Sequence, residues 1–255
     1  MQLGAHVERS SVLADAAASG SNTVQIFLSP PRSWAAPKSR GDENDLLNSG
    51  LAIYVHSPYL LNPASRDPEV RRKTRQALQD QAAAAAEIGA KGLVVHGGHP
   101  TGTGSVQDGI DNWVEVLDGI VLPVKLLIEN TAGGNAAVAR TFEAFARLFE
   151  TLHRKGHDIG VCLDTCHAHA GGEALEGVCE RMRMFAGSID LVHANDSRDT
   201  FNSGRDRHAN LGEGECGADA IVATVRAAKA PTVVETPGGI VKMSEDIDIL
   251  RRGLR

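Results

Sequence analysis

The sequence predicts one α/β domain spanning residues 1–255 and folded as a closed (β/α)8 TIM barrel, and three observations support this expectation. The length of 255 residues suits a single barrel of this class. Apolar runs recur along the chain with ends about 33 residues apart on average, which matches the roughly thirty residues or more that a strand, a crossover helix and two loops need. The runs are continuously apolar, as parallel strands buried on both faces are. An open doubly wound sheet is the weaker alternative.

Each expected strand is a short apolar run that ends at a polar or aromatic residue. In chain order, the eight strands are expected at residues 3–6, 24–27, 53–56, 93–96, 126–129, 161–164, 191–193 and 233–235. Two of the segments between them show clear helical patterns. Residues 68–88 contain a run of alanines and precede a glycine suited to a helix C-terminus, and residues 141–152 repeat phenylalanine and leucine at intervals of three and four.

Composition excludes several classes of protein. No window approaches 18 consecutive apolar residues and the N-terminus has no signal-peptide pattern, so we expect neither a membrane span nor secretion. The four cysteines are too few and too unevenly placed for a disulfide framework, which favours free thiols and a cytoplasmic location. No Gly-x-Gly-x-x-Gly or Gly-Lys-Ser/Thr motif is found where a nucleotide cofactor would need it. The formal charge of −6 does not exclude nucleic acid, because bound metal cations would change the local field.

Residues able to bind a metal ion end six consecutive expected strands, the third to the eighth. They are His56, His96, Glu129, Asp164, His193 and Glu235. Any one of them alone could be a structural histidine or a salt-bridge carboxylate. A barrel, however, brings the carboxyl ends of its strands around one pocket, where three converging carboxylates would repel each other unless cations neutralise them. The strand ends therefore predict a metal site.

Two loops add further ligands. His167 follows Asp164 by three residues, and Asp206 and His208 lie beyond the seventh strand, where an extended segment would place both on one face. Five histidines and four carboxylates exceed the three or four protein ligands of one zinc ion, so we expect a cluster of two or three metals. Mixed imidazole and carboxylate ligands favour zinc, with manganese or iron as alternatives, over magnesium. The pattern leaves open whether His6 belongs to the site.

Several blocks, in order from residue 3 to about residue 237, resemble the endonuclease IV family, the zinc-dependent apurinic/apyrimidinic endonucleases of base-excision repair. The two most specific blocks are Glu-Asn-Thr-Ala-Gly at 129–133 and Leu-Asp-Thr-Cys-His at 163–167. Further matching blocks are Gly-Ala-His-Val at 4–7, Gln-Ile-Phe at 25–27, His-Ser-Pro-Tyr-Leu at 56–60, His-Ala-Asn-Asp-Ser at 193–197, Asp-Arg-His at 206–208 and Glu-Thr-Pro at 235–237.

This resemblance implies three zinc ions and divides the nine candidate ligands among them. One ion would take His56, His96 and Glu129; the second would share Glu129 and take Asp164, His193 and Glu235; the third would take His167, Asp206 and His208. The implied reaction is hydrolysis of the phosphodiester 5′ to an abasic site in double-stranded DNA by a trinuclear zinc mechanism, leaving a 3′-hydroxyl and a 5′-deoxyribose phosphate.

The resemblance also implies individual roles. Glu129 would hold two ions together, and Glu235 would orient the attacking water or accept its proton, so both are candidate catalytic residues. Arg32, Tyr59 and Leu60 fall at the family's DNA-wedge positions. A monomer is implied.

Some loops depart from the family pattern. The loop after the second strand differs, so the position of Arg32 is open, and Glu8 stands where a serine is usual. His-Gly-Gly-His at 96–99 leaves a choice of ligand between His96 and His99. His96 is favoured because it ends an expected strand.

Rival functions remain. A metal-dependent sugar isomerase or epimerase on a related barrel would need only one or two ions, which leaves the third ligand set unexplained. A damage-binding protein without catalysis is disfavoured because every ligand position is retained. A barrel with purely structural metals would need sites closed to water.

Overall fold

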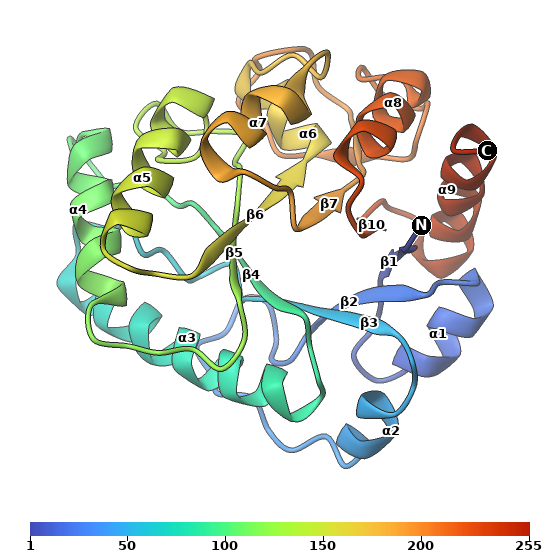
Figure 1. Ribbon diagram of the computed structural model, residues 1–255, viewed down its shortest axis with the longest axis horizontal. Helices are drawn as coiled ribbons and strands as arrows, with labels where there is room; N and C mark the ends of the chain where they lie inside the picture. Colours follow the sequence, from blue (N-terminus) through green and yellow to red (C-terminus); the bar gives the residue numbers. More distant parts are fainter.

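A computed structural model describes all 255 residues and shows a closed barrel of eight parallel strands enclosed by helices (Figure 1). The order around the barrel is β1-β2-β3-β4-β5-β6-β7-β10, closed by pairing of β10 with β1. The barrel strands are β1 (Leu3–His6), β2 (Thr23–Phe27), β3 (Ala52–His56), β4 (Gly92–His96), β5 (Leu126–Glu129), β6 (Ile159–Asp164), β7 (Leu191–His193) and β10 (Thr232–Val234). The predicted (β/α)8 fold is confirmed.

The helices surround the barrel (Figure 1). They are α1 (Val12–Ser19), α2 (Glu43–Leu47), α3 (Pro68–Glu87), α4 (Val106–Leu117), α5 (Phe142–Arg154), α6 (Thr165–Gly171), α7 (Val178–Ala186), α8 (Ala218–Ala228) and α9 (Gly239–Gly253). Of these, α3, α4, α5, α7, α8, α9 and α1 pack against one another in that order around the barrel. The two helices with clear sequence patterns, α3 and α5, both lie where they were predicted. Each begins at a side-chain cap, Asp67 for α3 and Thr141 for α5.

The eighth barrel strand begins and ends one residue earlier than predicted. The sequence places its end at Glu235, whereas β10 ends at Val234. The reason is local, because the backbone N–H of Glu235 donates to Oδ1 of Asn195 over 2.8 Å instead of to a neighbouring strand. This bond fixes Glu235 at the mouth of the barrel.

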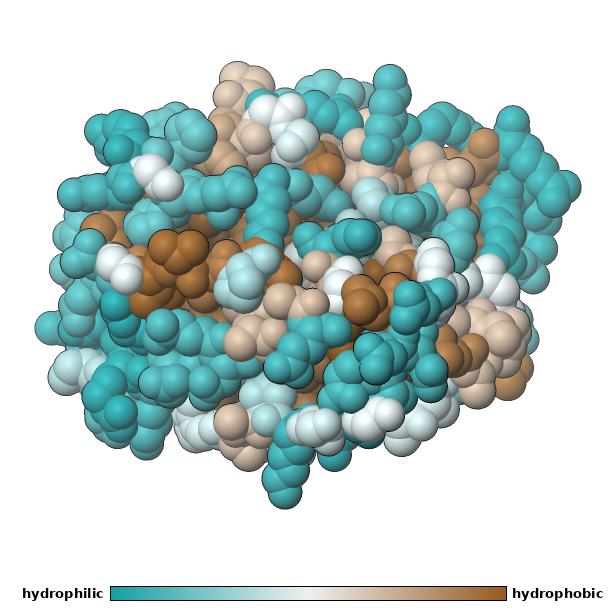
Figure 2. Space-filling view, turned by 60° about the horizontal axis from the view of Figure 1, so that its bottom comes forward, coloured by the Kyte–Doolittle hydropathy of each residue, from teal (hydrophilic) through white to brown (hydrophobic).

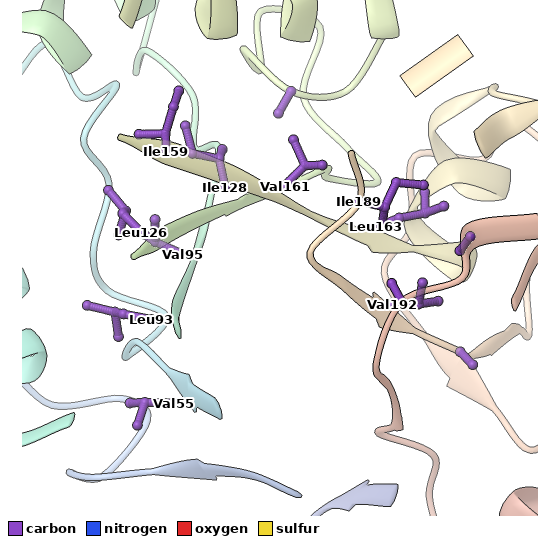
Figure 3. Close-up of a cluster of buried hydrophobic side chains, with 14 of the residues drawn as sticks. Val55, Leu93, Val95, Leu126, Ile128, Ile159, Val161, Leu163, Ile189 and Val192 are labelled. Carbon is purple, nitrogen blue, oxygen red and sulfur yellow. The ribbon is translucent and has the colours of Figure 1, made fainter. Parts of the chain in front are cut away.

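Alternation of side chains along the strands separates two apolar layers. Outward-facing residues pack against the helices in a large core, part of which is drawn in Figure 3. A second cluster, which we call the inner layer, fills the barrel interior. It consists of Ala52, Tyr54, Val94, Leu127, Cys162 and Leu191. Every member except Ala52 precedes an expected metal ligand by two residues, so the inner layer forms an apolar floor directly beneath the predicted site.

The face drawn in Figure 2 is mostly hydrophilic, and its apolar side chains gather in hollows between polar ones. No helix combines the length and the hydropathy that crossing a bilayer would require.

Candidate metal centre

The nine predicted ligands converge at the carboxyl end of the barrel. The structure assembles them into groups whose ligand atoms lie within 4.8 Å of one another. Three of these groups are His56, His96 and Glu129; Glu129, Asp164, His193 and Glu235; and His167, Asp206 and His208. We call them the first, second and third groups. Their membership is the same as that of the ligand sets which the resemblance implies.

Glu129 lies between the first and second groups and is fully buried. Its Oε2 is 3.2 Å from Nε2 of His56 and 3.3 Å from Nε2 of His96. Its Oε1 is 3.1 Å from Nδ1 of His193 and 3.1 Å from Nδ1 of His167. Burial alone would raise the pKa of Glu129, but the surrounding imidazoles hold that pKa well below its usual value. Glu129 is therefore ionised, with Oε2 facing the histidines of the first group and Oε1 facing His193 and His167.

Backbone carbonyls orient three of the imidazoles. Nδ1 of His56 donates to the carbonyl of Ser57 over 2.7 Å, and Nδ1 of His167 donates to the carbonyl of Asn130 over 2.9 Å. Nδ1 of His208 donates to the carbonyl of Glu235 over 3.2 Å. A carbonyl can only accept, so the proton sits on Nδ1 and the Nε2 lone pair is left for a ligand. This is the arrangement that metal-binding histidines adopt.

The third group provides a direct test of whether a metal fits. Nε2 of His167 and Nε2 of His208 are buried and have no hydrogen-bond partner. Both atoms nevertheless face Oδ1 of Asp206, at 3.1 Å and 3.3 Å. Burial alone would lower the pKa of His167, but the carboxylates of Asp164 and Asp206 raise that pKa well above its ordinary value. The third group therefore favours a positive charge. A divalent cation would satisfy two lone pairs and a carboxylate at once, so the donor set fits a metal.

The Leu-Asp-Thr-Cys-His block explains how Asp164 and His167 come together. Asp164 ends β6 and caps α6, because its Oδ1 accepts the backbone N–H of His167 over 2.7 Å. Its Oδ2 accepts Nδ2 of Asn195 over 2.7 Å. Asn130 pairs with the backbone of Asp164 in both directions, at 2.8 and 3.0 Å. One carboxylate thus starts a helix and orients a second ligand one turn later.

The segment that carries Asp206 and His208 differs from the extended strand expected for it. Only His208 is in a strand, the short β9 (His208–Ala209), which pairs antiparallel with β8 (Asp196–Ser197). Asp206 lies in the connection between these strands, and its Oδ1 is 3.3 Å from Nε2 of His208. The pairing of β9 with β8 holds this end of the connection, and so both residues, at the mouth of the barrel.

Asp246 of α9 anchors the chain on both sides of the site. Its Oδ1 accepts the backbone N–H of Leu211 over 2.9 Å, and its Oδ2 accepts Nδ2 of Asn210 over 2.8 Å and Oγ1 of Thr236 over 2.5 Å. It thereby ties the segment after His208 to the segment after Glu235.

We expect Asp246→Asn to lower the free energy of unfolding by about 1–3 kcal/mol, because a buried amide would face donors that need acceptors. Chemical denaturation measures the change. The matched control is Asp248→Asn on the exposed side of the same helix, where the loss of one surface ion pair with Arg251 costs at most about 0.5 kcal/mol. Equal stabilities of the two variants would show that Asp246 does not anchor these segments.

The histidines for which the sequence left alternatives open lie at different places around the groups. His96 lies in the first group, whereas His99 is exposed and its Nδ1 faces the carbonyl of Pro100. His6 lies beside the second group, with Nδ1 3.0 Å from Oε1 of Glu235. His169 contacts Phe201 outside the three groups.

Three amide side chains around the predicted ligands lie in blocks that carry the family resemblance, but the sequence assigned no role to them. They are Gln25, Asn130 and Asn195, and all are buried. The available signal was weak. Gln25 is a polar residue inside an apolar strand run, and Asn130 and Asn195 follow strand ends, but amides carry no charge that would mark them as ligands.

The predicted wedge residues lie on loops at the mouth and are all exposed. The Tyr59 ring stacks on the His96 ring, with centroids 5.8 Å apart and an interplanar angle of 14°. Its backbone N–H donates to the carbonyl of Pro31 over 2.8 Å, which joins the Tyr59 loop to the loop of Arg32. Tyr59, His208 and Glu235 line one cavity of about 630 Å³.

Comparisons with known proteins extend over nearly the whole chain. A family model described as a xylose isomerase-like TIM barrel matches residues 13–253. A protein called probable endonuclease 4 from Mycobacterium tuberculosis is 49% identical over 236 residues, which cover 92% of this chain and 93% of the relative. The crystal structure of endonuclease IV from Thermus thermophilus matches with a TM-score of 0.84 and 28% identity, covering 100% of this chain and 99% of that one. A D-tagatose 3-epimerase-like protein has a TM-score of 0.79 at 23% identity, which shows a shared fold alone.

Proposed function

From the premise that this chain belongs to the endonuclease IV family, we propose that it acts as a single-domain, monomeric DNA repair enzyme that cuts duplex DNA 5′ to abasic sites. The chain is a nuclease, as its relatives are. The observation that carries the finer proposal is the convergence of nine ligand side chains in three groups, with Glu129 common to two of them. The products would be a 3′-hydroxyl and a 5′-deoxyribose phosphate.

The three groups would hold three zinc ions. Four carboxylates against three divalent ions would leave a charge of roughly +2 in the cavity, which favours a phosphodiester over a neutral sugar. The chemistry that bound zinc supplies is Lewis acidity, which lowers the pKa of water and neutralises charge developing on phosphate oxygens. Imidazole ligands disfavour magnesium at these positions.

The protein's own side chains would prepare the reaction. Glu129 stays ionised among its imidazoles and would join the first and second groups. Glu235 is mostly buried but lines the cavity, and its Oε1 is 2.7 Å from Nε2 of Gln25. Its Oε2 lies 3.1 Å from Nδ1 of His193 and would be the oxygen that orients the attacking water or accepts its proton. The apolar inner layer excludes water from below.

A nicking assay tests the proposed reaction. The substrate is an oligonucleotide duplex with one tetrahydrofuran abasic analogue, and the matched control is the same duplex with an intact nucleotide. We expect cleavage of the first alone, at its 5′ side, with a 3′ end that a DNA polymerase extends directly. Tight binding without cleavage by zinc-loaded protein would instead indicate a damage-binding protein. Turnover of ketoses without nicking would indicate an epimerase.

Tyr59 is expected to contribute to DNA binding through stacking. Tyr59→Ala should weaken binding of the abasic duplex roughly 10-fold, because one aromatic contact with a base contributes about 1–3 kcal/mol. Fluorescence anisotropy in a Glu129→Gln background, which should not cleave, measures the affinity. Leu47→Ala, an exposed apolar position on α2, is the control and should bind like the parent. Unchanged affinity of Tyr59→Ala, with zinc content intact, would remove Tyr59 from the wedge.

A further inference from the structure

A buried glutamine connects two ligands of the second group without belonging to any group. Gln25 lies in β2 and is fully buried. Its Oε1 is 2.8 Å from Nε2 of His193, and its Nε2 is 2.7 Å from Oε1 of Glu235. His6 completes the cluster, since its Nδ1 lies 3.0 Å from both Nε2 of Gln25 and Oε1 of Glu235.

The chemistry of the partners fixes which way the Gln25 amide points. An ionised carboxylate can only accept hydrogen bonds, so the group 2.7 Å from Oε1 of Glu235 must be the NH₂ of the amide. The amide oxygen therefore faces His193 and accepts from its Nε2–H. The flipped amide would place two acceptors in contact at Glu235, which a buried site does not tolerate.

This orientation determines which nitrogen of His193 can bind a metal. A neutral, metal-binding imidazole carries one proton, and because Nε2 is the nitrogen that faces the Gln25 oxygen, Nδ1 is the nitrogen left to bind a metal. That Nδ1 faces the interior of the second group, 3.1 Å from Oε1 of Glu129 and 3.1 Å from Oε2 of Glu235. His193 would therefore bind through Nδ1, in contrast to His56, His167 and His208, whose Nε2 atoms are free.

The same amide determines how Glu235 can bind. Oε1 of Glu235 accepts a hydrogen bond from Nε2 of Gln25 and is also in contact with His6. Oε2 faces His193. One oxygen is thus held by the protein and the other is directed at the centre. Without this contact, the carboxylate could rotate and present either oxygen or both.

We infer that Gln25 is a positioning residue for the second group: it holds His193 in the tautomer that binds through Nδ1 and turns one oxygen of Glu235 toward the same ion. This inference rests on the proposed metal site. The residue acts through two ligands and touches neither metal nor DNA.

Zinc binding by Gln25→Met tests the inference without relying on catalysis. Methionine has a similar length and leaves the barrel filled, but it can neither donate to Glu235 nor accept from His193. We expect the zinc equivalent of the second group to bind roughly 10- to 100-fold more weakly, and the other two to keep wild-type affinity. Competition with a chromophoric chelator gives the affinities, and elemental analysis gives zinc per chain. Gln81→Met is the matched control, because Gln81 is equally buried but donates to Ser29, away from every ligand.

Several outcomes would overturn the inference. Wild-type affinity for all zinc equivalents in folded Gln25→Met would do so, and so would an equal weakening of every equivalent in Gln25→Met and Gln81→Met. If Gln25→Met does not fold, Gln25→Asn replaces it, since its amide is one methylene too short to reach both partners and should show the same selective loss. Wild-type protein that binds no zinc would overturn the proposed metal site itself, and is thus distinguishable from failure of the Gln25 variants alone.

Discussion

Glu129→Gln is expected to reduce nicking of an abasic duplex by on the order of 10³-fold or more, because it removes the carboxylate proposed to be shared by two metal ions. Both oxygens of Glu129 face imidazole nitrogens at 3.1 to 3.3 Å. A glutamine keeps the shape, but its NH₂ would point at nitrogens that should be left free for metal. Single-turnover cleavage rates at saturating enzyme measure the change in chemistry apart from DNA affinity.

The barrel itself should survive this substitution. Circular dichroism should remain that of the parent, since the amide occupies the same volume above the inner layer. Glu115→Gln is the matched control, because Glu115 is an exposed partner of Arg71 at 2.9 Å and should leave cleavage unchanged. Glu235→Gln should also abolish cleavage while the barrel folds. Turnover at the wild-type rate by folded, zinc-loaded Glu129→Gln or Glu235→Gln would refute the assignment of that residue.

Prolonged chelation should abolish cleavage and also destabilise the protein. Glu129 and Asp164 are fully buried carboxylates, and without cations their charge is offset only by imidazoles that must take up protons. If zinc is normally present at about 1,000 times its dissociation constant, one site contributes ~4 kcal/mol of stability. The melting temperature should fall by roughly 10 °C for such a contribution in a chain of this size.

Readdition of metals separates this effect from damage to the protein. Zinc should restore both cleavage and melting temperature, whereas magnesium should restore neither, since imidazole-rich sites bind it poorly. The measurements are nicking rates and differential scanning calorimetry on protein whose metal content is known. Full nicking activity in protein shown to be metal-free would eliminate the metal mechanism.

The fold could be predicted from the sequence because each barrel strand is a continuous apolar run and the runs recur at regular spacing. The ligands at strand ends were predictable for a related reason, since a parallel barrel sends His56, Glu129 and Asp164 to one rim whatever the loops do. The spacing of Asp206 and His208 predicted that the two could bind one ion, but the addition of His167 to this set required the family resemblance, because His167 comes from a distant loop.

The amides around the ligands were beyond the reach of such reasoning. Gln25 sits in an apolar run, and only three-dimensional packing reveals that its side chain points inward between His193 and Glu235. The end of β10 was missed by one residue because a side chain, Asn195, takes the place of a strand partner. Side-chain hydrogen bonds of this kind leave no periodic pattern in the sequence.

The inner layer closes the barrel below the ligands, and this makes the site a blind-ended chamber. Solvent, chelators and exchanging ions would reach the ligands through the open mouth, where Tyr59 lines the cavity. A DNA duplex seated on that mouth would cover it. Bound DNA would then close the chamber. Metal ions that exchange with solvent in the free enzyme would be unable to exchange while DNA is bound.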